Sequence, residues 1–353
     1  MSVIRETARY FGREKGVTLM TLVLFACLIW AWASSGHHPA SSADDPFSEA
    51  SRIQTTQEIR DLSRSLETDF SRHPGVVSAV LVLILMAALG ALVDLWLLAR
   101  YREKVRGGIR FLGRSPAGWS LGDVFGLFVL LFFSEWVISA CFAVLDRFEL
   151  IPVLGPNTIL MASTFLRSLV VLAALLHLAG KKYGRSLADL GFGTRRIWKQ
   201  CAVGIVAYAG MIPLYLIVVV GVSQVVHWVG VEPPVQTPVQ VLYREDNSRL
   251  LWSFALFMGI AGPWFEEVFF RGFVYQAFRV RWGVRGGVAL TSVLFAALHA
   301  NWVAFFPILI LALALNVLFE ETGSVIPGAV LHMTHNLVML GATLGVKTLL
   351  AAG

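Results

Sequence analysis

Seven side chains that carry charge or an amide lie inside or beside apolar segments of the last third of the chain. They are Glu266, Glu267, Arg271, His299, His332, His335 and Asn336. A charge near the middle of a bilayer costs about 2.5 to 3.5 kcal/mol on insertion scales, so such residues require partners or a function. Carboxylates and imidazoles transfer protons near neutral pH, and amides donate hydrogen bonds to an oxyanion. The set therefore has the parts needed to hydrolyse an amide with activated water.

Their spacing predicts different roles for the two neighbouring glutamates. Successive residues of an α-helix point about 100° apart, whereas residues four apart lie on one face. Glu267 and Arg271 are four residues apart, so we expect a salt bridge between them. Glu266 is then the carboxylate that is free to act as a general base.

The histidines and the asparagine lie on two further predicted helices. His332 and Asn336 are also four residues apart and form a hydrogen-bonding pair, with His335 on an adjoining face. At 1.5 Å per residue, Glu266 and His299 each lie about 18 Å from the cytoplasmic side, and His332 lies about 12 Å from it. Three helices thus carry proton-transfer groups at a similar depth. This predicts a shared cavity that opens towards the cytoplasm.

The composition indicates an α-helical integral membrane protein. Of the 353 residues, 56% are hydrophobic and 15% are charged, with a mean hydropathy of +0.69, which is more apolar surface than a soluble fold buries. The apolar stretches are too long and continuous for β-barrel strands, so we predict an all-α polytopic protein with about eight transmembrane helices. The predicted segments, with a break around Asn301 and Pro307, are 17–33, 76–99, 123–145, 157–179, 201–222, 250–278, 287–304, 305–319 and 325–345.

The net charge of +6 reflects membrane orientation and does not indicate a nucleic-acid partner, because the basic residues lie in short loops between apolar segments. Loops 100–115 and 180–200 are rich in lysine and arginine and are expected in the cytoplasm, together with the N-terminus. A basic N-terminal flank followed by an apolar segment and an external loop suggests a bacterial inner (plasma) membrane protein in contact with the lipid bilayer.

We divide the chain into four regions. The first is a signal anchor or a cleaved signal peptide, the second an external polar insertion, the third a set of N-terminal transmembrane helices and the fourth the region with the polar cluster. In order, they span residues 1–33, 34–75, 76–199 and 200–345. In the third region Glu135 and Arg167 lie at similar depths on neighbouring segments, so we expect a structural ion pair, with catalysis as the alternative.

Three ordered motifs carry a family resemblance. They are Glu266-Glu267-Val-Phe-Phe-Arg271, Phe295-Ala-Ala-Leu-His299 and His332-Met-Thr-His-Asn336. His299 follows Glu266 by 33 residues, and His332 follows His299 by the same interval. Residues 200–345 resemble the CPBP family of intramembrane endopeptidases, which includes the CAAX prenyl endopeptidases and bacterial Abi-like bacteriocin-processing and immunity proteins. The resemblance implies that Glu266 and His299 activate water and that His332 and Asn336 stabilise the tetrahedral oxyanion. Glu267, Arg271 and His335 then have supporting roles.

The resemblance also implies a substrate class and a mode of catalysis. It implies cleavage of a membrane-associated peptide or protein, and in eukaryotic members of the family the cleaved tripeptide follows a prenylated cysteine. Peptide cleavage carries over to this chain more readily than prenyl specificity does. We expect catalysis without a metal. Zinc bound by Glu266, His299 and His332 is the alternative, although the chain has no HExxH motif.

Three other interpretations remain open. A proton-coupled transporter also uses carboxylates and histidines near the bilayer midplane, but the cluster is confined to one third of the chain and no internal repeat is visible. A non-catalytic immunity or scaffold protein would bind a peptide without cutting it. A buried polar network could also serve only to fix helix packing.

Overall fold

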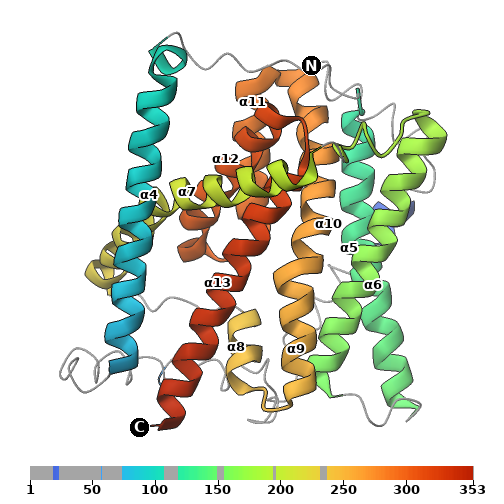
Figure 1. Cartoon of the computed structure of the whole chain (residues 1–353). Helices are drawn as coiled ribbons and strands as arrows, with labels where there is room; N and C mark the ends of the chain where they lie inside the picture. The colour runs from blue at the N-terminus through green and yellow to red at the C-terminus, as the bar shows by residue number, and fades with distance from the viewer. Residues whose placement is uncertain are drawn as a thin grey trace. The chain divides into compact units, whose positions relative to one another are not determined.

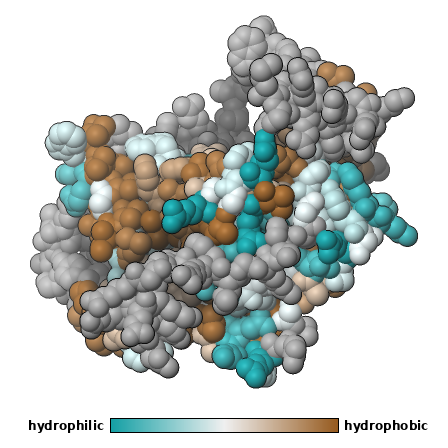
Figure 2. Space-filling view, turned by 90° about the horizontal axis from the view of Figure 1, so that it is seen from above, coloured by the Kyte–Doolittle hydropathy of each residue, from teal (hydrophilic) through white to brown (hydrophobic). Residues whose placement is uncertain are grey.

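The computed structural model describes residues 19–23, 57, 74–106, 118–148, 155–193, 196–230 and 237–352. Most of these residues are helical and none forms a β-strand, and much of the described surface in Figure 2 is apolar. The predicted all-α, multi-span class is therefore confirmed. The count of about eight is not, because six of the described helices are long and apolar enough to cross a bilayer. These spans are 81–99, 121–145, 157–182, 197–229, 302–322 and 325–345.

The predicted regions 1–33 and 34–75 lie almost entirely outside the described residues. The proposed signal segment and external insertion therefore remain predictions, as does the boundary at residue 199. The described helices divide between two compact units, of which one includes 117–189 and the other includes 46–116 and 190–353.

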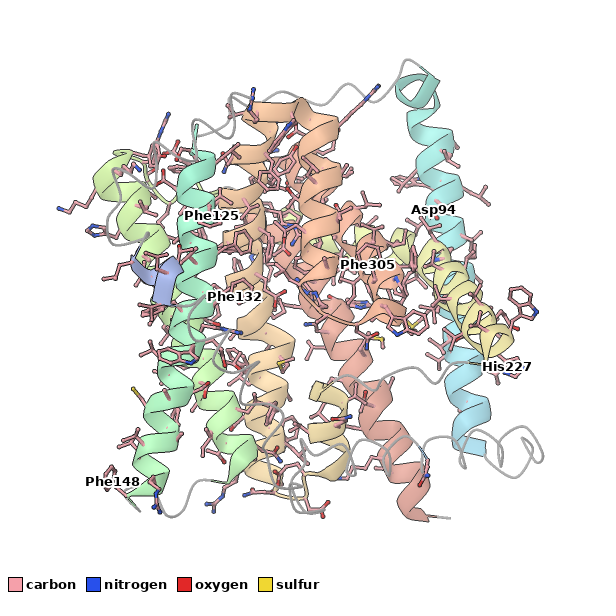
Figure 3. All side chains as sticks on the ribbon, turned by 180° about the vertical axis from the view of Figure 1, so that it is seen from behind. Asp94, Phe125, Phe132, Phe148, His227 and Phe305 are labelled. Atoms are coloured by element: carbon pink, nitrogen blue, oxygen red, sulfur yellow. The ribbon has the colours of Figure 1, made fainter. Side chains whose placement is uncertain are left out.

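The first unit contains two packed membrane-spanning helices. They are α5 (Leu121–Arg147) and α6 (Pro156–His177), and a π-helical turn, η3 (Leu178–Lys182), continues α6. Their apolar side chains are widely exposed, as in Phe125 and Phe132 of α5 (Figure 3). A helix with an apolar surface of this kind is typical of a membrane span.

A buried aspartate, Asp123, connects the start of α5 to the end of η3. Asp123, at the start of α5, accepts hydrogen bonds from Ser120 Oγ and Lys182 Nζ, both at 2.6 Å, and from the hydroxyl of Tyr183. Burial and the hydrogen bond to Asp123 raise the pKa of the Tyr183 hydroxyl, which therefore remains a donor. The contacts hold the end of η3 against the start of α5.

The second unit is built around α7 (Ile197–Val229), which crosses α13 (Val325–Ala352) at a steep angle in Figure 1. The unit also contains α4 (Pro74–Arg106), the short α8 (Thr237–Arg244) and α12 (Trp302–Thr322). A buried core joins α7, α12 and α13. Its members are Tyr208, Met211, Ile212, Leu311, Leu315 and Leu331.

Helices α4 and α7 meet at small residues. Gly90 lies against the backbone carbonyl of Ala209 and the ring of Pro213, so a side chain at this position would collide with α7. One turn further along α4, Asp94 lies beside Gly210 and on the side of α4 that faces α7 (Figure 3). Close packing of small residues is a common means of associating helices in membranes.

A long helix of alternating α and π segments carries the two glutamates. It consists of α9 (Ser248–Leu256), η4 (Phe257–Ala261), α10 (Gly262–Phe269), η5 (Phe270–Tyr275) and the first arm of α11 (Gln276–Ala297). The chain turns at Gly283, where φ is 69°, a value that favours glycine, and the second arm of α11 folds back. Two π-helical turns thus flank Glu266 and Glu267, and such turns occur frequently at functional sites.

The break between α11 and α12 lies at Asn301 and not at Pro307. The side chain of Asn301 accepts the N–H groups of Val303 and Ala304 at 3.1 and 3.0 Å, which caps the start of α12. Pro307 lies inside α12. The predicted break is therefore confirmed at Asn301 and wrong at Pro307, because the cap and not the proline sets the start of the helix.

Candidate active site

A fully buried ion pair forms the base of the site. Arg271 Nη1 donates to Glu267 Oε1 at 2.9 Å, and both side chains are 0% exposed. Arg271 Nη2 also donates to the carbonyl of Ala312 at 3.4 Å, and its guanidinium lies 4.7 Å from the centre of the Phe295 ring. The expected contact between Glu267 and Arg271 is present, and α12 and α11 hold the arginine in place.

His332 lies between the two glutamates. Its Nδ1 is 3.1 Å from Glu267 Oε1, and its Nε2 is 3.8 Å from Glu266 Oε2. Because Glu267 is paired with Arg271 as a carboxylate, it accepts, and His332 Nδ1 must carry a proton. His332 Nε2 is then an acceptor in the neutral ring and a donor in the imidazolium. Gly328, one turn earlier on α13, lets Glu267 approach this helix closely.

His299 has a fixed ring orientation as well. Its Nδ1 lies 2.8 Å from the carbonyl of Phe295, which can only accept, so Nδ1 carries the proton and Nε2 of the neutral ring has a free lone pair. The ring of Phe295 packs against His299 and His332, with centroid distances of 5.0 and 5.8 Å. The side chain of Glu266 is 41% exposed and His299 is exposed, so both can meet water or a substrate.

Asn336 lies one turn after His332 on α13. Its Nδ2 donates to the carbonyl of Met258 in η4 at 2.8 Å. An amide nitrogen carries two N–H groups, so this bond leaves a second one that can donate to a substrate oxygen.

His335 faces a different neighbour. It is buried, and its ring makes edge contacts with Tyr208 and Tyr215 of α7 at centroid distances of 6.1 and 4.9 Å. This placement gives His335 a packing role between α13 and α7.

The described residues contain no group of three or more His, Cys, Asp or Glu side chains arranged to hold a metal ion. The zinc alternative requires Glu266, His299 and His332 to act as one ligand set. Of their distances, the one between His332 Nε2 and Glu266 Oε2 is 3.8 Å, and His332 Nδ1 is bound to Glu267. In such a set His332 would bind the metal through Nε2, because a metal-bound histidine commonly donates its other ring N–H to a carboxylate.

Two further buried polar groups had no role in the sequence interpretation. Asn316 donates to Ser292 at 2.9 Å between α12 and α11. Glu320, near the end of α12, accepts from Tyr275 at 2.7 Å and from Arg279 at 2.9 Å. The spacing could have indicated these groups, because Tyr275 follows Arg271 by one helical turn and Glu320 follows Asn316 by one turn, which places each pair on one helix face.

The ion pair predicted in the first unit is also present. Arg167 Nη1 of α6 lies 3.0 Å from Glu135 Oε2 of α5, and the two side chains are 29% and 34% exposed. The pair joins the two spans of its own unit, as a structural ion pair would.

Fold and site together define an all-helical, multi-pass membrane protein in which a buried Glu–Arg pair orients a histidine beside a second, exposed glutamate. Residues 248–338 match the family described as type II CAAX prenyl endopeptidase Rce1-like. The match spans less than half of the chain, includes all three motifs and confirms the resemblance seen in the sequence. Searches among curated proteins and among solved structures found no match.

Proposed function

We propose that the chain is an intramembrane endopeptidase that hydrolyses a peptide bond in a membrane-associated protein, with CAAX-type prenylated proteins as the substrate class. The observation that carries the proposal is the position of His332, held by buried Glu267 and facing exposed Glu266. The family match over residues 248–338 supports the same chemistry. A purely structural network has no need of a second carboxylate beside Nε2 of the buried histidine.

The first step is addition of water to the scissile carbonyl. Glu266, assisted by Nε2 of His299, takes a proton from water while the water oxygen forms a bond to the carbonyl carbon. The carbonyl double bond becomes a C–O single bond, and its electron pair moves to the oxygen. The product is a tetrahedral oxyanion.

Asn336 and His332 then stabilise this oxyanion. Asn336 supplies the N–H that its bond to Met258 leaves over, and imidazolium His332 supplies Nε2–H. Collapse breaks the C–N bond, and the proton held by Glu266 passes to the leaving nitrogen. Water is thereby divided between a new carboxyl group and a new amino group.

We also propose that this cycle needs no metal ion, that the protein lies in the bacterial inner membrane with its N-terminus in the cytoplasm, and that it has no nucleic-acid partner. A zinc-dependent enzyme would bind the metal through Nε2 of His332, with Nδ1 still held by Glu267. Metal analysis of the purified protein distinguishes the two mechanisms.

The test uses wild type and Glu266→Ala purified in detergent, with bound metal measured in both. The substrates are a fluorescent peptide that ends in a farnesylated cysteine and three further residues, and the same peptide without the farnesyl group. Cleavage of the farnesylated peptide by wild type alone supports the proposal. Cleavage of both peptides by wild type keeps the peptidase but removes prenyl specificity, and equal profiles from folded wild type and variant contradict the peptidase.

A further inference from the structure

The carbonyl that binds Asn336 has no regular hydrogen-bond donor in its own helix. In an α-helix the carbonyl of Met258 would accept from residue 262, and in a π-helix it would accept from residue 263. The N–H of Gly262 is donated to Phe257 O instead, and Pro263 has no N–H. Both regular donors are thus absent, and Asn336 Nδ2 takes their place at 2.8 Å.

Close packing of η4 on α13 fixes this contact. Gly259 is buried, and a Cβ at this position would lie 2.6 Å from Leu337 Cδ2, the neighbour of Asn336 on α13. The backbone of the π-helical turn can therefore reach the side chain of Asn336 directly. Pro263 is also buried, and it lies three residues before Glu266 on the same helix.

We infer that Pro263 is a positioning residue for Asn336: by withholding an N–H from the π-helical turn, it keeps Met258 O free to orient the amide. One N–H of the planar amide is fixed by Met258 O, so the direction of the second is fixed as well. This second N–H is the oxyanion donor of the proposed function, on which the inference rests. An oxyanion donor must be oriented before the reaction to stabilise the transition state.

The main test is Pro263→Ala. The new N–H can donate to Met258 O and compete with Asn336, so we expect kcat to fall between about 10-fold and 100-fold with little change in KM, because the oxyanion exists only beyond the ground state. The thermal unfolding temperature should stay equal or rise, since alanine favours a helix interior more than proline does. Pro213→Ala in α7 is the matched control and should leave cleavage unchanged, because Pro213 packs on Gly90 and not on the site.

A double-variant cycle separates positioning from a general effect. If Pro263 acts through Asn336, adding Pro263→Ala to Asn336→Ala should change the residual rate no further. Independent, multiplicative losses would overturn the inference.

The remaining outcomes are equally decisive. If wild type and Pro263→Ala cleave the peptide at the same rate, the inference fails and the proposed function stands. If wild type cleaves neither peptide, the proposed function fails and the inference with it. Pro263→Val also restores the N–H and keeps more of the buried volume, and failure of both variants to fold would show that Pro263 is required for folding, which contradicts the inference.

Discussion

Two of the Glu–Arg pairs in the described helices, Glu135–Arg167 and Glu267–Arg271, differ in what surrounds them. Glu135 and Arg167 join two helices of the first unit at 3.0 Å, are about one third exposed, and Glu135 Oε2 makes no hydrogen bond of good geometry. Glu267 and Arg271 join consecutive turns of one helix at 2.9 Å, are fully buried and are hydrogen-bonded.

Within the described part of the chain, the two pairs differ because only the buried pair contacts a histidine, His332. The buried pair holds His332, and through it faces Glu266, whereas the pair in the first unit holds no histidine among the described residues. A bare ion pair neutralises charge in the membrane, but a buried pair with a histidine fixes which ring nitrogen is free. The comparison therefore separates a pair that serves packing from one that prepares a reactive group.

The largest expected effect comes from breaking the buried pair. Arg271→Leu leaves Glu267 charged and without its cation, so we expect the free energy of unfolding in micelles to fall by about 3–5 kcal/mol. Adding Glu267→Gln removes the unpaired charge and should restore part of this stability without restoring peptide cleavage. If the double variant cleaved like wild type, the buried pair would have no role beyond packing.

A smaller effect is expected when a methyl group is added at Gly328, beside the buried pair. A Cβ at Gly328 would lie 2.8 Å from Glu267 Oε2, which has no hydrogen-bond partner among the described residues. Because Arg271 and His332 hold the carboxylate, we expect Gly328→Ala to reduce stability by about 1–3 kcal/mol and to lower kcat. Gly341→Ala on the same helix meets open space and serves as the control. Unchanged kcat in Gly328→Ala would show that the position of Glu267 is not critical.

The smallest effect should come from the pair in the first unit. The double variant Glu135→Gln with Arg167→Leu makes the same exchange as in the buried pair. Since both side chains are partly exposed, we expect stability to change by no more than about 1 kcal/mol and cleavage to stay within about twofold of wild type. Loss of cleavage with normal folding would instead give Glu135 and Arg167 a part in the reaction.

The sequence predicted those features that depend on local spacing. The four-residue interval between Glu267 and Arg271 predicted their contact, and long apolar runs predicted most of the spans. The π-helical turns could not be predicted, because hydrophobic periodicity does not distinguish one extra residue per turn. The expected count of about eight spans is not confirmed among the described residues, where α11 folds back at Gly283 and its second arm is shorter than the roughly 20 residues that a span needs.

Contacts between helices that are distant in the sequence could not be predicted from local spacing. His335 and His332 are three residues apart, yet His335 packs on Tyr208 and Tyr215 of α7 while His332 meets the two glutamates. Which neighbour each ring meets depends on how α13 crosses α7. The binding of Asn336 to a backbone carbonyl of η4 likewise leaves no trace in composition.

The most direct test of the account is the single-turnover cleavage rate of the farnesylated peptide by Glu266→Gln. The glutamine keeps the shape of the side chain but cannot take a proton from water, so the account predicts a rate at least about 100-fold below wild type with unchanged unfolding temperature. Glu321→Gln, which changes an exposed glutamate at the end of α12, should cleave like wild type. A Glu266→Gln protein that cleaves the peptide as fast as wild type would contradict the central claim that Glu266 activates the water.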